Sequence, residues 1–267
     1  MSGEAAKLLD RVLVIAVEAG EKILKVYHSD FAVTNKNDNS PLTEADLAAH
    51  SHIVAALEQL EPRLPILSEE AANIPYSARR RWNRYWLVDP LDGTKEFVKR
   101  NGEFTVNIAL IENHRPVLGV VHAPVLGVSY GATQDAGAFR IDGSQRKAMH
   151  TRKCPARPAF VVSRSHQDDA LDALLARAPK HEAVSRGSSL KFCLVAEGSA
   201  DFYPRTGPTS EWDTAAGQCI VEQAGGVAWR LPELTPLAYN EKELLLNPPF
   251  AVLGDPSYDW AQLLREP

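Results

Sequence analysis

The chain lacks the features that mark membrane, secreted and disulfide-stabilised proteins. No stretch of its 267 residues is an apolar run long enough to span a bilayer. Its first residues show no apolar core before a small-residue cleavage site, so no secretory signal is evident. The three cysteines, Cys154, Cys193 and Cys219, lie far apart without C-x-x-C spacing, which indicates reduced, partly buried thiols. We therefore expect a cytoplasmic protein.

The chain also lacks a large excess of positive or negative charge, which argues against a nucleic-acid-binding protein. The net charge is −5, with 24% charged residues, and the lysines and arginines are scattered rather than arranged along one face. Nucleic-acid-binding proteins usually carry a basic patch or stripe, so we expect no nucleic-acid partner. With 45% apolar residues, the chain can bury a substantial core in one large domain or two closely packed ones.

The hydrophobic periodicity predicts two halves of different character. Residues 1–150 carry two amphipathic helices, a short strand and then a β-rich region with a hairpin around Asn113–Arg115. The basic, proline-bearing stretch 146–157 resembles a link between domains. Residues 151–267 alternate strands with helices, the helices being at 169–176, 189–197 and 214–223. We predict an α+β N-terminal half and an α/β C-terminal half, with helices and sheets in alternating layers.

The most informative segment places two carboxylates in one tight turn. An apolar run leads into Asp89 and Asp92, and Gly93 and Thr94 close the turn. Because Pro90 and Gly93 disfavour a continuing helix or a central strand, we predict the end of a strand turning into a loop. Two neighbouring acids repel each other and are hard to bury, so a hard divalent cation is expected between them. The Gly93 and Thr94 amides are well placed to hold a phosphate oxygen.

Other acids occupy similar places at the ends of predicted elements. Asp46, Glu69 and Asp213 resemble the turn acids in this respect, and apolar residues precede Glu69 and Asp213. Taken alone, Asp213 would be interpreted as a helix N-cap. Taken as a set, oxygen ligands without paired cysteines or histidines favour Mg²⁺ over Zn²⁺. The number of acids exceeds what one Mg²⁺ takes from protein, so we expect two or more ions, about 3.5–4 Å apart.

The motifs that contain these acids are similar to those of a known family. They resemble the lithium-sensitive, magnesium-dependent phosphatases of the inositol monophosphatase superfamily, and within it the CysQ-like branch of 3′(2′),5′-bisphosphate nucleotidases. The resemblance covers nearly the whole chain, and the D-P-x-D-G-T and W-D-x-A-A-G signatures are its most specific parts. It rests on segments 68–70, 89–97, 163–166, 187–191 and 212–217. It implies a layered αβαβα sandwich.

The resemblance also implies roles for individual residues. The expected ligands of two or three Mg²⁺ ions are Glu69, Asp89, the Leu91 carbonyl, Asp92 and Asp213. Asp46 and Thr94, with Glu70, are expected to orient and deprotonate the attacking water. The substrate phosphate is expected to contact residues Glu69, Leu91, Asp92, Gly93, Thr94 and Asp213. The resemblance thus divides the expected roles between the two halves of the chain. Residues 1–150 carry most of the metal ligands, and residues 151–267 carry Asp213 and the substrate contacts.

The reaction that the resemblance implies belongs to sulfur assimilation. It is hydrolysis of the 3′-phosphate of adenosine 3′,5′-bisphosphate, or of its sulfated form, by in-line attack of a metal-activated water. The products are phosphate and either AMP or adenosine 5′-phosphosulfate. Lys95 and Glu96 support this branch, because inositol monophosphatases usually carry a Thr-Asn pair before the aromatic residue that follows. Candidate nucleotide contacts are Ser163, His166, Ser189 and Lys191.

Simpler interpretations remain open for some of these features. His166 alone could be a surface histidine, and Lys191, on a predicted helix, could be a solvated charge. An inositol-1-phosphate phosphatase is the alternative within the superfamily. A non-catalytic nucleotide-binding protein is the alternative from another class, and it would be expected to have lost the Asp46–Thr94 pair or a metal ligand. The resemblance implies a small-molecule nucleotide as partner, and it allows a homodimer and peripheral association with the inner membrane.

Overall fold

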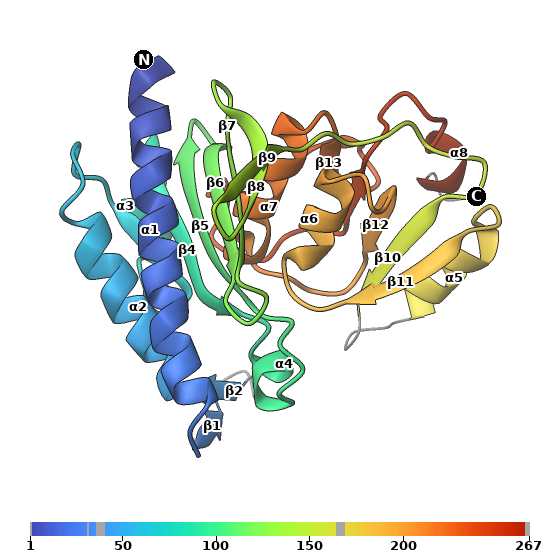
Figure 1. Ribbon diagram of the computed structural model, residues 1–267. Helices are drawn as coiled ribbons and strands as arrows, with labels where there is room; N and C mark the ends of the chain where they lie inside the picture. The colour runs from blue at the N-terminus through green and yellow to red at the C-terminus, as the bar shows by residue number, and fades with distance from the viewer. Residues whose placement is uncertain (1, 31, 36–40, 164–168, 265–267) are drawn as a thin grey trace.

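Alternating layers of helix and sheet make up the computed structural model, which describes residues 2–30, 32–35, 41–163 and 169–264 (Figure 1). Helices α1 (Ser2–Tyr27) and α2 (Glu44–Leu57) cover the outer face of a seven-stranded sheet. Helices α6 (Leu190–Ala196) and α7 (Glu211–Gln223) lie between this sheet and a six-stranded one. Helices α5 (Asp169–Arg177) and α8 (Ala261–Leu264) pack beyond the second sheet. The predicted αβαβα sandwich is confirmed.

The seven-stranded sheet carries the β-rich region of the N-terminal half. Its order is β3-β4-β5-β6-β7-β8-β9, and only β3 and β4 pair in parallel. The predicted hairpin joins β5 to β6, with Asn113 and His114 in the left-handed region. The strands are Ile66–Ser68, Arg84–Asp92, Thr105–Glu112, Arg115–Ala123, Val128–Thr133, Gly137–Asp142 and Gln145–Ala148. The last strand overlaps the stretch 146–157, so the start of the predicted link belongs to the sheet instead.

The six-stranded sheet departs from the predicted α/β alternation after α7. Its order is β11-β10-β12-β15-β13-β14, in which β10 pairs in parallel with β11 and β12. The last three strands follow α7 directly and pair antiparallel, which the sequence pattern did not predict. The strands β10 to β15 are Ala159–Ser163, Glu182–Arg186, Phe202–Arg205, Val227–Arg230, Thr235–Pro236 and Phe250–Leu253. The C-terminal half is therefore a mixed sheet with helices on both faces.

Short elements complete the described chain. A β1–β2 ribbon (Val33–Asn35 and Pro41–Thr43) precedes α2, and Thr43 caps that helix. A single 3₁₀ turn, η1 (Glu69–Ala71), follows β3, and α3 (Tyr76–Arg79) leads into β4. Helix α4 (Thr94–Val98) follows β4, with Gly93 at its N-cap. The described helices include none with the length and apolar character needed to cross a membrane.

Strand β4 corrects the prediction that the chain leaves the sheet at Pro90. The strand passes through Pro90 and ends at Asp92, and its register against β5 shifts between Asp89 and Asp92. Strand β3 pairs only as far as Val88, so no neighbour on that side requires the amide hydrogen that proline lacks. A proline can therefore occupy a central strand just beyond the end of its shorter neighbour. The irregular register turns both acids toward the end of the sheet.

Close glycine contacts hold helix α7 between strand β6 and helix α6. A Cβ atom at Gly119 of β6 would lie 2.5 Å from the Ala216 carbonyl oxygen, and one at Gly217 would lie 2.5 Å from Phe192 Cγ. The small residues of the W-D-x-A-A-G motif thus allow α7 to approach both neighbours. The largest buried cluster contains residues from both halves of the chain. The division into 1–150 and 151–267 remains a prediction.

We expect Gly217→Ala to destabilise the protein by about 1–3 kcal/mol, because the new methyl group forces Phe192 to move in a packed interior. In an unconstrained helix the same change would stabilise by roughly 0.5–1 kcal/mol, so the sign is informative. Denaturant unfolding measures the difference in the free energy of unfolding between each variant and the unmodified protein. Gly254→Ala is the matched control, since its Cβ would meet neighbours only at 3.5 Å or more. Equal stability of both variants would contradict the close packing proposed at Gly217.

His122 of β6 is a buried histidine under helix α1. Its side chain is 6% exposed, its Nδ1 lies 2.8 Å from Ser129 Oγ, and a Cβ at Gly20 of α1 would lie 2.7 Å from its ring. Burial lowers the pKa of His122 from 6.5 to about 4, although a backbone hydrogen bond with Val128 acts in the opposite direction. The folded protein therefore keeps this ring neutral in a range where the unfolded chain protonates it.

We expect His122 to make stability fall as the pH falls from 6.5 to 4, because the unfolded chain binds the extra proton. The full effect is about 3 kcal/mol. Chemical denaturation at several pH values should show a shallower acid slope for His122→Gln than for the unmodified protein. His28→Gln, at an exposed histidine, should keep the original slope. If His122→Gln kept the slope of the unmodified protein, His122 would not be the source of the loss of stability at acid pH.

Candidate metal and phosphate site

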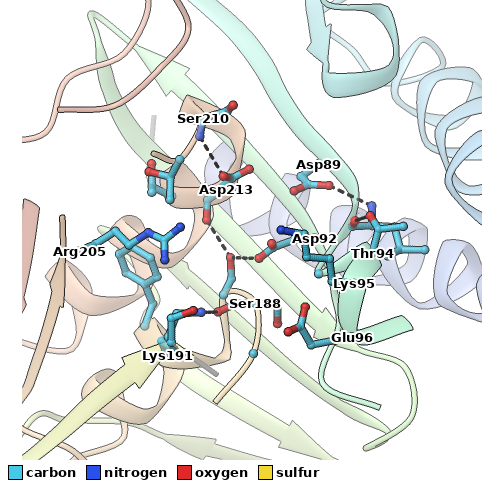
Figure 2. Close-up of a pocket in the computed structure, with 18 of the residues that line it drawn as sticks. Asp89, Asp92, Thr94, Lys95, Glu96, Ser188, Lys191, Arg205, Ser210 and Asp213 are labelled. Atoms are coloured by element: carbon cyan, nitrogen blue, oxygen red, sulfur yellow. Dashed lines mark hydrogen bonds between the residues drawn. The ribbon is translucent and has the colours of Figure 1, made fainter. Parts of the chain in front are cut away.

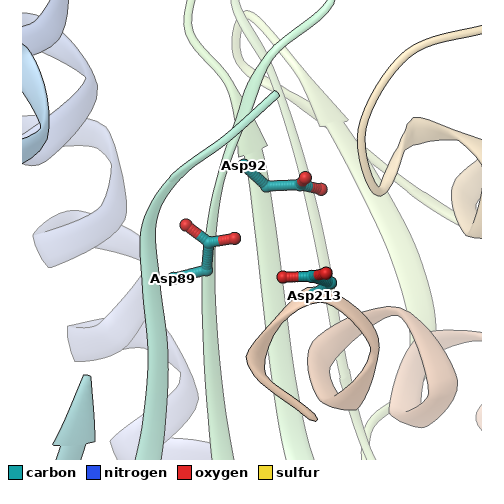
Figure 3. A group of neighbouring side chains, drawn as sticks. All are labelled: Asp89, Asp92 and Asp213. Carbon is teal, nitrogen blue, oxygen red and sulfur yellow. The ribbon is translucent and has the colours of Figure 1, made fainter. Parts of the chain in front are cut away.

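Three predicted metal ligands meet where the end of β4 faces the start of α7. Asp89 and Asp92 come from β4 and Asp213 comes from α7 (Figure 3). One carboxylate oxygen from each lies within 4.8 Å of the others. Residues separated by more than a hundred positions in the chain are thus brought to a common point, as the sequence analysis expected.

Local hydrogen bonds fix the carboxylates of Asp89 and Asp213. The Leu91 amide donates to Asp89 Oδ1 at 3.0 Å, within the irregular part of β4. The Ser210 amide donates to Asp213 Oδ2 at 2.8 Å in a capping box. Ser210, rather than Asp213, is therefore the N-cap of α7, and Asp213 occupies the third helical position. In that position its side chain lies beside those of Asp89 and Asp92 (Figure 3).

The three acids are electrostatically strained. Burial, and then the charges of Glu69, Asp92 and Asp213, hold the pKa of Asp89 well above its ordinary value. Burial and the neighbouring acids raise the pKa of Asp213 in the same way. Burial also raises the pKa of Asp92, although Lys191 and the Ser189 hydroxyl oppose this. A divalent cation would relieve this repulsion, and the all-oxygen donor set fits Mg²⁺.

Glu69 and the Leu91 carbonyl lie at the same site. Glu69 begins η1 directly after β3, which runs parallel to β4, so both strands end at the same edge of the sheet. It is close enough to Asp89 to raise the pKa of that acid. The Leu91 carbonyl oxygen lies 3.3 Å from Thr94 Oγ1. The structure therefore brings together all the residues predicted to hold metal.

The predicted Asp46–Thr94 pair is formed. Thr94 Oγ1 lies 3.4 Å from Asp46 Oδ1. The other oxygen, Asp46 Oδ2, accepts hydrogen bonds from the Thr43 amide at 2.8 Å and the Thr43 hydroxyl at 2.7 Å. The capping box of α2 thus orients Asp46, which is 1% exposed, toward Thr94. Asp46 lies behind Thr94 rather than in the pocket wall.

Glu70 has a different environment from its neighbour Glu69. It is half-buried and lies near His50, whose pKa is lowered by burial and raised in part by the Glu70 charge. His50 Nδ1 lies 2.8 Å from Ser68 Oγ. The described residues that line the pocket include Glu69 but not Glu70. A direct role of Glu70 toward water stays a prediction.

A pocket of about 330 Å³ opens beside the acids (Figure 2). Gly93, with φ of +91°, turns the chain from β4 into α4, and Gly93 and Thr94 both line the pocket as predicted for phosphate contacts. A Cβ at Gly93 would lie 3.2 Å from the Glu103 carbonyl oxygen, so the turn is also closely packed. Other lining residues come from the C-terminal half, among them Ser163, Ser188, Ser189, Lys191, Tyr203, Arg205 and Asp213.

Cationic side chains form the wall opposite the acids. Lys191 is 6% exposed, so it is not the solvated charge that a surface helix would give, and its Nζ donates to the Ser188 carbonyl at 2.6 Å. Burial lowers the pKa of Lys191 to about 8, and Asp92 opposes this. Arg205 ends β12 beside it and donates to the Pro208 carbonyl at 2.9 Å. Arg205 Nε and Ser188 Oγ are buried without a hydrogen-bond partner among the described residues.

The sequence analysis did not single out Arg205, which lies at the end of β12. Ser189, a candidate nucleotide contact, lines the pocket beside the acids. The Ser189 hydroxyl lies 2.8 Å from both Asp92 Oδ2 and the Asp213 carbonyl, and it accepts a hydrogen bond from Asn107. It therefore supports the acids directly. Ser163 lines the pocket at the end of β10, and His166 lies outside the described residues.

Buried carboxylates that can hold divalent cations, next to a cationic wall in one pocket, define a site for metal-assisted chemistry on an anionic ligand. Residues 7–254 match the Inositol monophosphatase family. The chain belongs to the inositol monophosphatase family.

Individual relatives agree with this assignment. Over 250 residues the chain is 50% identical to the 3′(2′),5′-bisphosphate nucleotidase CysQ of Escherichia coli, covering 92% of this chain and 99% of that protein. The crystal structure of CysQ from Bacteroides thetaiotaomicron has 42% identity and a TM-score of 0.83, covering 93% and 97% of the two chains. An inositol monophosphatase from Anabaena, at 23% identity and a TM-score of 0.77, covers 96% and 94% and shares the fold.

We expect Asp92→Asn to remove tight Mg²⁺ binding without unfolding the protein. The substitution takes away one ligand charge and also relieves repulsion among the buried acids. In EDTA the variant should melt at or above the temperature of the unmodified protein. Added Mg²⁺ should raise the melting temperature of the unmodified protein but not that of the variant.

Asp135→Asn, at an exposed turn, is the matched control and should keep the full Mg²⁺-induced shift. Mg²⁺-dependent phosphatase activity should be lost only in Asp92→Asn. A variant that retained both the shift and the activity would exclude Asp92 from the metal site.

Proposed function

We propose that this protein is a Mg²⁺-dependent 3′(2′),5′-bisphosphate nucleotidase. It removes the 3′-phosphate of adenosine 3′,5′-bisphosphate, and of the sulfated form, to give AMP or adenosine 5′-phosphosulfate and phosphate. The observation that carries the proposal is the presence of an acidic and a cationic wall in one pocket, which suits a substrate with two phosphates. The curated relatives that bear this name match nearly the whole chain.

The acidic wall would hold two or three Mg²⁺ ions. Their proposed ligands are the carboxylates and the carbonyl that converge there, namely Glu69, Asp89, Leu91, Asp92 and Asp213. Bound Mg²⁺ supplies a lowered pKa for water and neutralises negative charge on the phosphate oxygens. The same residues, with the Gly93 and Thr94 amides, would keep the 3′-phosphate at this end of the pocket.

Asp46 and Thr94 would prepare the nucleophile. When the Thr94 hydroxyl donates to Asp46 Oδ1, its oxygen lone pairs are available to accept a hydrogen bond from a water in the pocket. The water proton can then pass to Thr94 Oγ1 while the hydroxyl proton passes to Asp46. Because Thr43 holds the other Asp46 oxygen, this acid cannot rotate away. The oriented water attacks phosphorus in line with the departing ribose oxygen.

The cationic wall would bind the 5′-phosphate. Lys191 and Arg205 both line that part of the pocket, and their positive charges would pair with the phosphate oxygens. The two halves of the chain thus have distinct proposed tasks. Residues 1–150 supply most of the metal ligands, while residues 151–267 supply Asp213 and the substrate contacts.

The alternatives fit the pocket less well. Inositol 1-phosphate carries one phosphate, so it would leave Lys191 and Arg205 without a second phosphate to bind. A non-catalytic binding protein would not require the Asp46–Thr94 pair, which is present and oriented by the capping box of α2.

A panel of substrates at fixed Mg²⁺ tests the proposal: adenosine 3′,5′-bisphosphate, its sulfated form, inositol 1-phosphate and fructose 1,6-bisphosphate. A preference for inositol 1-phosphate would overturn the nucleotide assignment, and no phosphate release from any of them would overturn the enzyme assignment.

We expect Lys191→Met to raise the KM for adenosine 3′,5′-bisphosphate by roughly 10- to 100-fold, because a charged hydrogen bond to the 5′-phosphate contributes about 1.5–3 kcal/mol. The KM for adenosine 3′-phosphate, which has no 5′-phosphate, should change much less. Steady-state kinetics on both substrates measures the difference. Lys180→Met, at an exposed lysine, should match the unmodified protein. An equal increase in KM for both substrates would argue against a 5′-phosphate site at Lys191.

A further inference from the structure

Residues Asn240–Asn247 form a strap that crosses the start of α7 beside the pocket. The Glu211 amide donates to the Leu245 carbonyl at 2.8 Å, and the Asn247 amide donates to the Thr209 carbonyl at 2.8 Å. Between these two bonds, Leu246 forms an isolated antiparallel bridge with Ser210. The backbone of the strap is thus fixed against the residue that caps α7.

Side chains anchor both ends of the strap as well. At one end, buried Arg79 of α3 donates from Nη1 to Asn240 Oδ1 at 2.5 Å, and the Asn240 amide donates to Glu211 Oε2 at 2.8 Å. At the other end, Asn247 Nδ2 donates to the Ser210 carbonyl at 2.7 Å. These hydrogen bonds hold the backbone of the strap in place, so its outward-facing side chains stay exposed.

Three consecutive leucines on this strap have different environments. Leu245 is half-buried and packs against the main core, whereas Leu244 is 67% exposed and Leu246 is 46% exposed. Of the two exposed side chains, Leu246 lines the pocket and Leu244 does not. An exposed apolar side chain that lines the pocket and is held in place by the backbone offers a surface that a ligand can cover.

The position of Leu246 within the pocket indicates which part of a ligand it meets. Its backbone bridge to Ser210 places Leu246 against the loop that runs from Arg205 to Asp213. Pro208, an apolar residue on that loop, also lines the pocket, and its carbonyl accepts a hydrogen bond from Arg205. This apolar wall therefore borders both the cationic wall and the acidic wall.

We propose that Leu246, together with Pro208, forms a subsite for the face of the substrate nucleobase. The inference rests on the proposed nucleotidase function, because the two charged walls take the phosphates and the sugar is polar. The base is the remaining part of the substrate with an extensive apolar surface, and Leu246 loses its exposure to water by packing against it. Contact with the face of the ring favours substrates that carry a base over those that lack one.

The test compares Leu246→Ser with Leu244→Ser, a matched change two residues earlier on the same strap. Each variant is assayed with adenosine 3′,5′-bisphosphate and with an abasic analogue that keeps the sugar and both phosphates. For the nucleotide, Leu246→Ser should raise KM roughly five- to tenfold with little change in kcat, since it removes about half of a leucine burial. Its KM for the abasic analogue should not change. Leu244→Ser should match the unmodified protein on both substrates.

Thermal unfolding of both variants checks that they are folded. Leu246→Ala provides a second variant with a smaller change in polarity. An unchanged KM for the nucleotide in both Leu246 variants would overturn the subsite. An equal rise in KM for the nucleotide and the abasic analogue would also overturn it, because the effect would then not depend on the base. If the unmodified protein released no phosphate from the nucleotide, the proposed function itself would fail, whatever the variants did.

Discussion

Repulsion among buried carboxylates is the constraint on which the rest of this structure depends. One carboxylate oxygen each of Asp89, Asp92 and Asp213 lies within 4.8 Å of the others. Burial raises the pKa of all three acids, and the charges of neighbouring acids add to this effect at Asp89 and Asp213. Such an arrangement disfavours the folded protein unless cations occupy it, so the surrounding structure must prevent the acids from separating. The fold supplies this restraint through hydrogen bonds to the acids and through close packing of the elements that carry them.

The restraint comes from both halves of the chain. Strand β4 keeps two of the acids in the seven-stranded sheet beyond the end of its neighbour β3. Helix α7 carries the third, and Gly119 and Gly217 allow that helix to approach β6 and α6 closely. The Ser189 hydroxyl, on the segment before α6, connects Asp92 to the backbone of Asp213. The same packing that stabilises the interior therefore sets the geometry of the site, and it places the cationic residues opposite the acids.

Much of the site could be predicted from the sequence because its parts are local. Asp89 and Asp92 are three residues apart in the sequence, and Thr43 stands three residues before Asp46, at the start of an apolar helix. The layered fold and most helices and strands follow from periodicity and from the family resemblance. The errors arose where tertiary context decided the outcome. Pro90 stays in β4 because β3 is short, and the strands after α7 pair antiparallel with partners that are distant in the chain.

Residue types and spacings within short segments were sufficient to predict the acidic wall and its oxygen ligands for a hard cation. The residues that face this wall could be found only from the tertiary structure. Arg205 is an ordinary arginine at the end of a strand, and Leu246 is one of three adjacent leucines, so neither is distinguished by its local sequence. Their positions depend on the pairing of β12 in the second sheet and on the strap that crosses α7. These are long-range contacts, and a local pattern carries no information about which distant residues will meet.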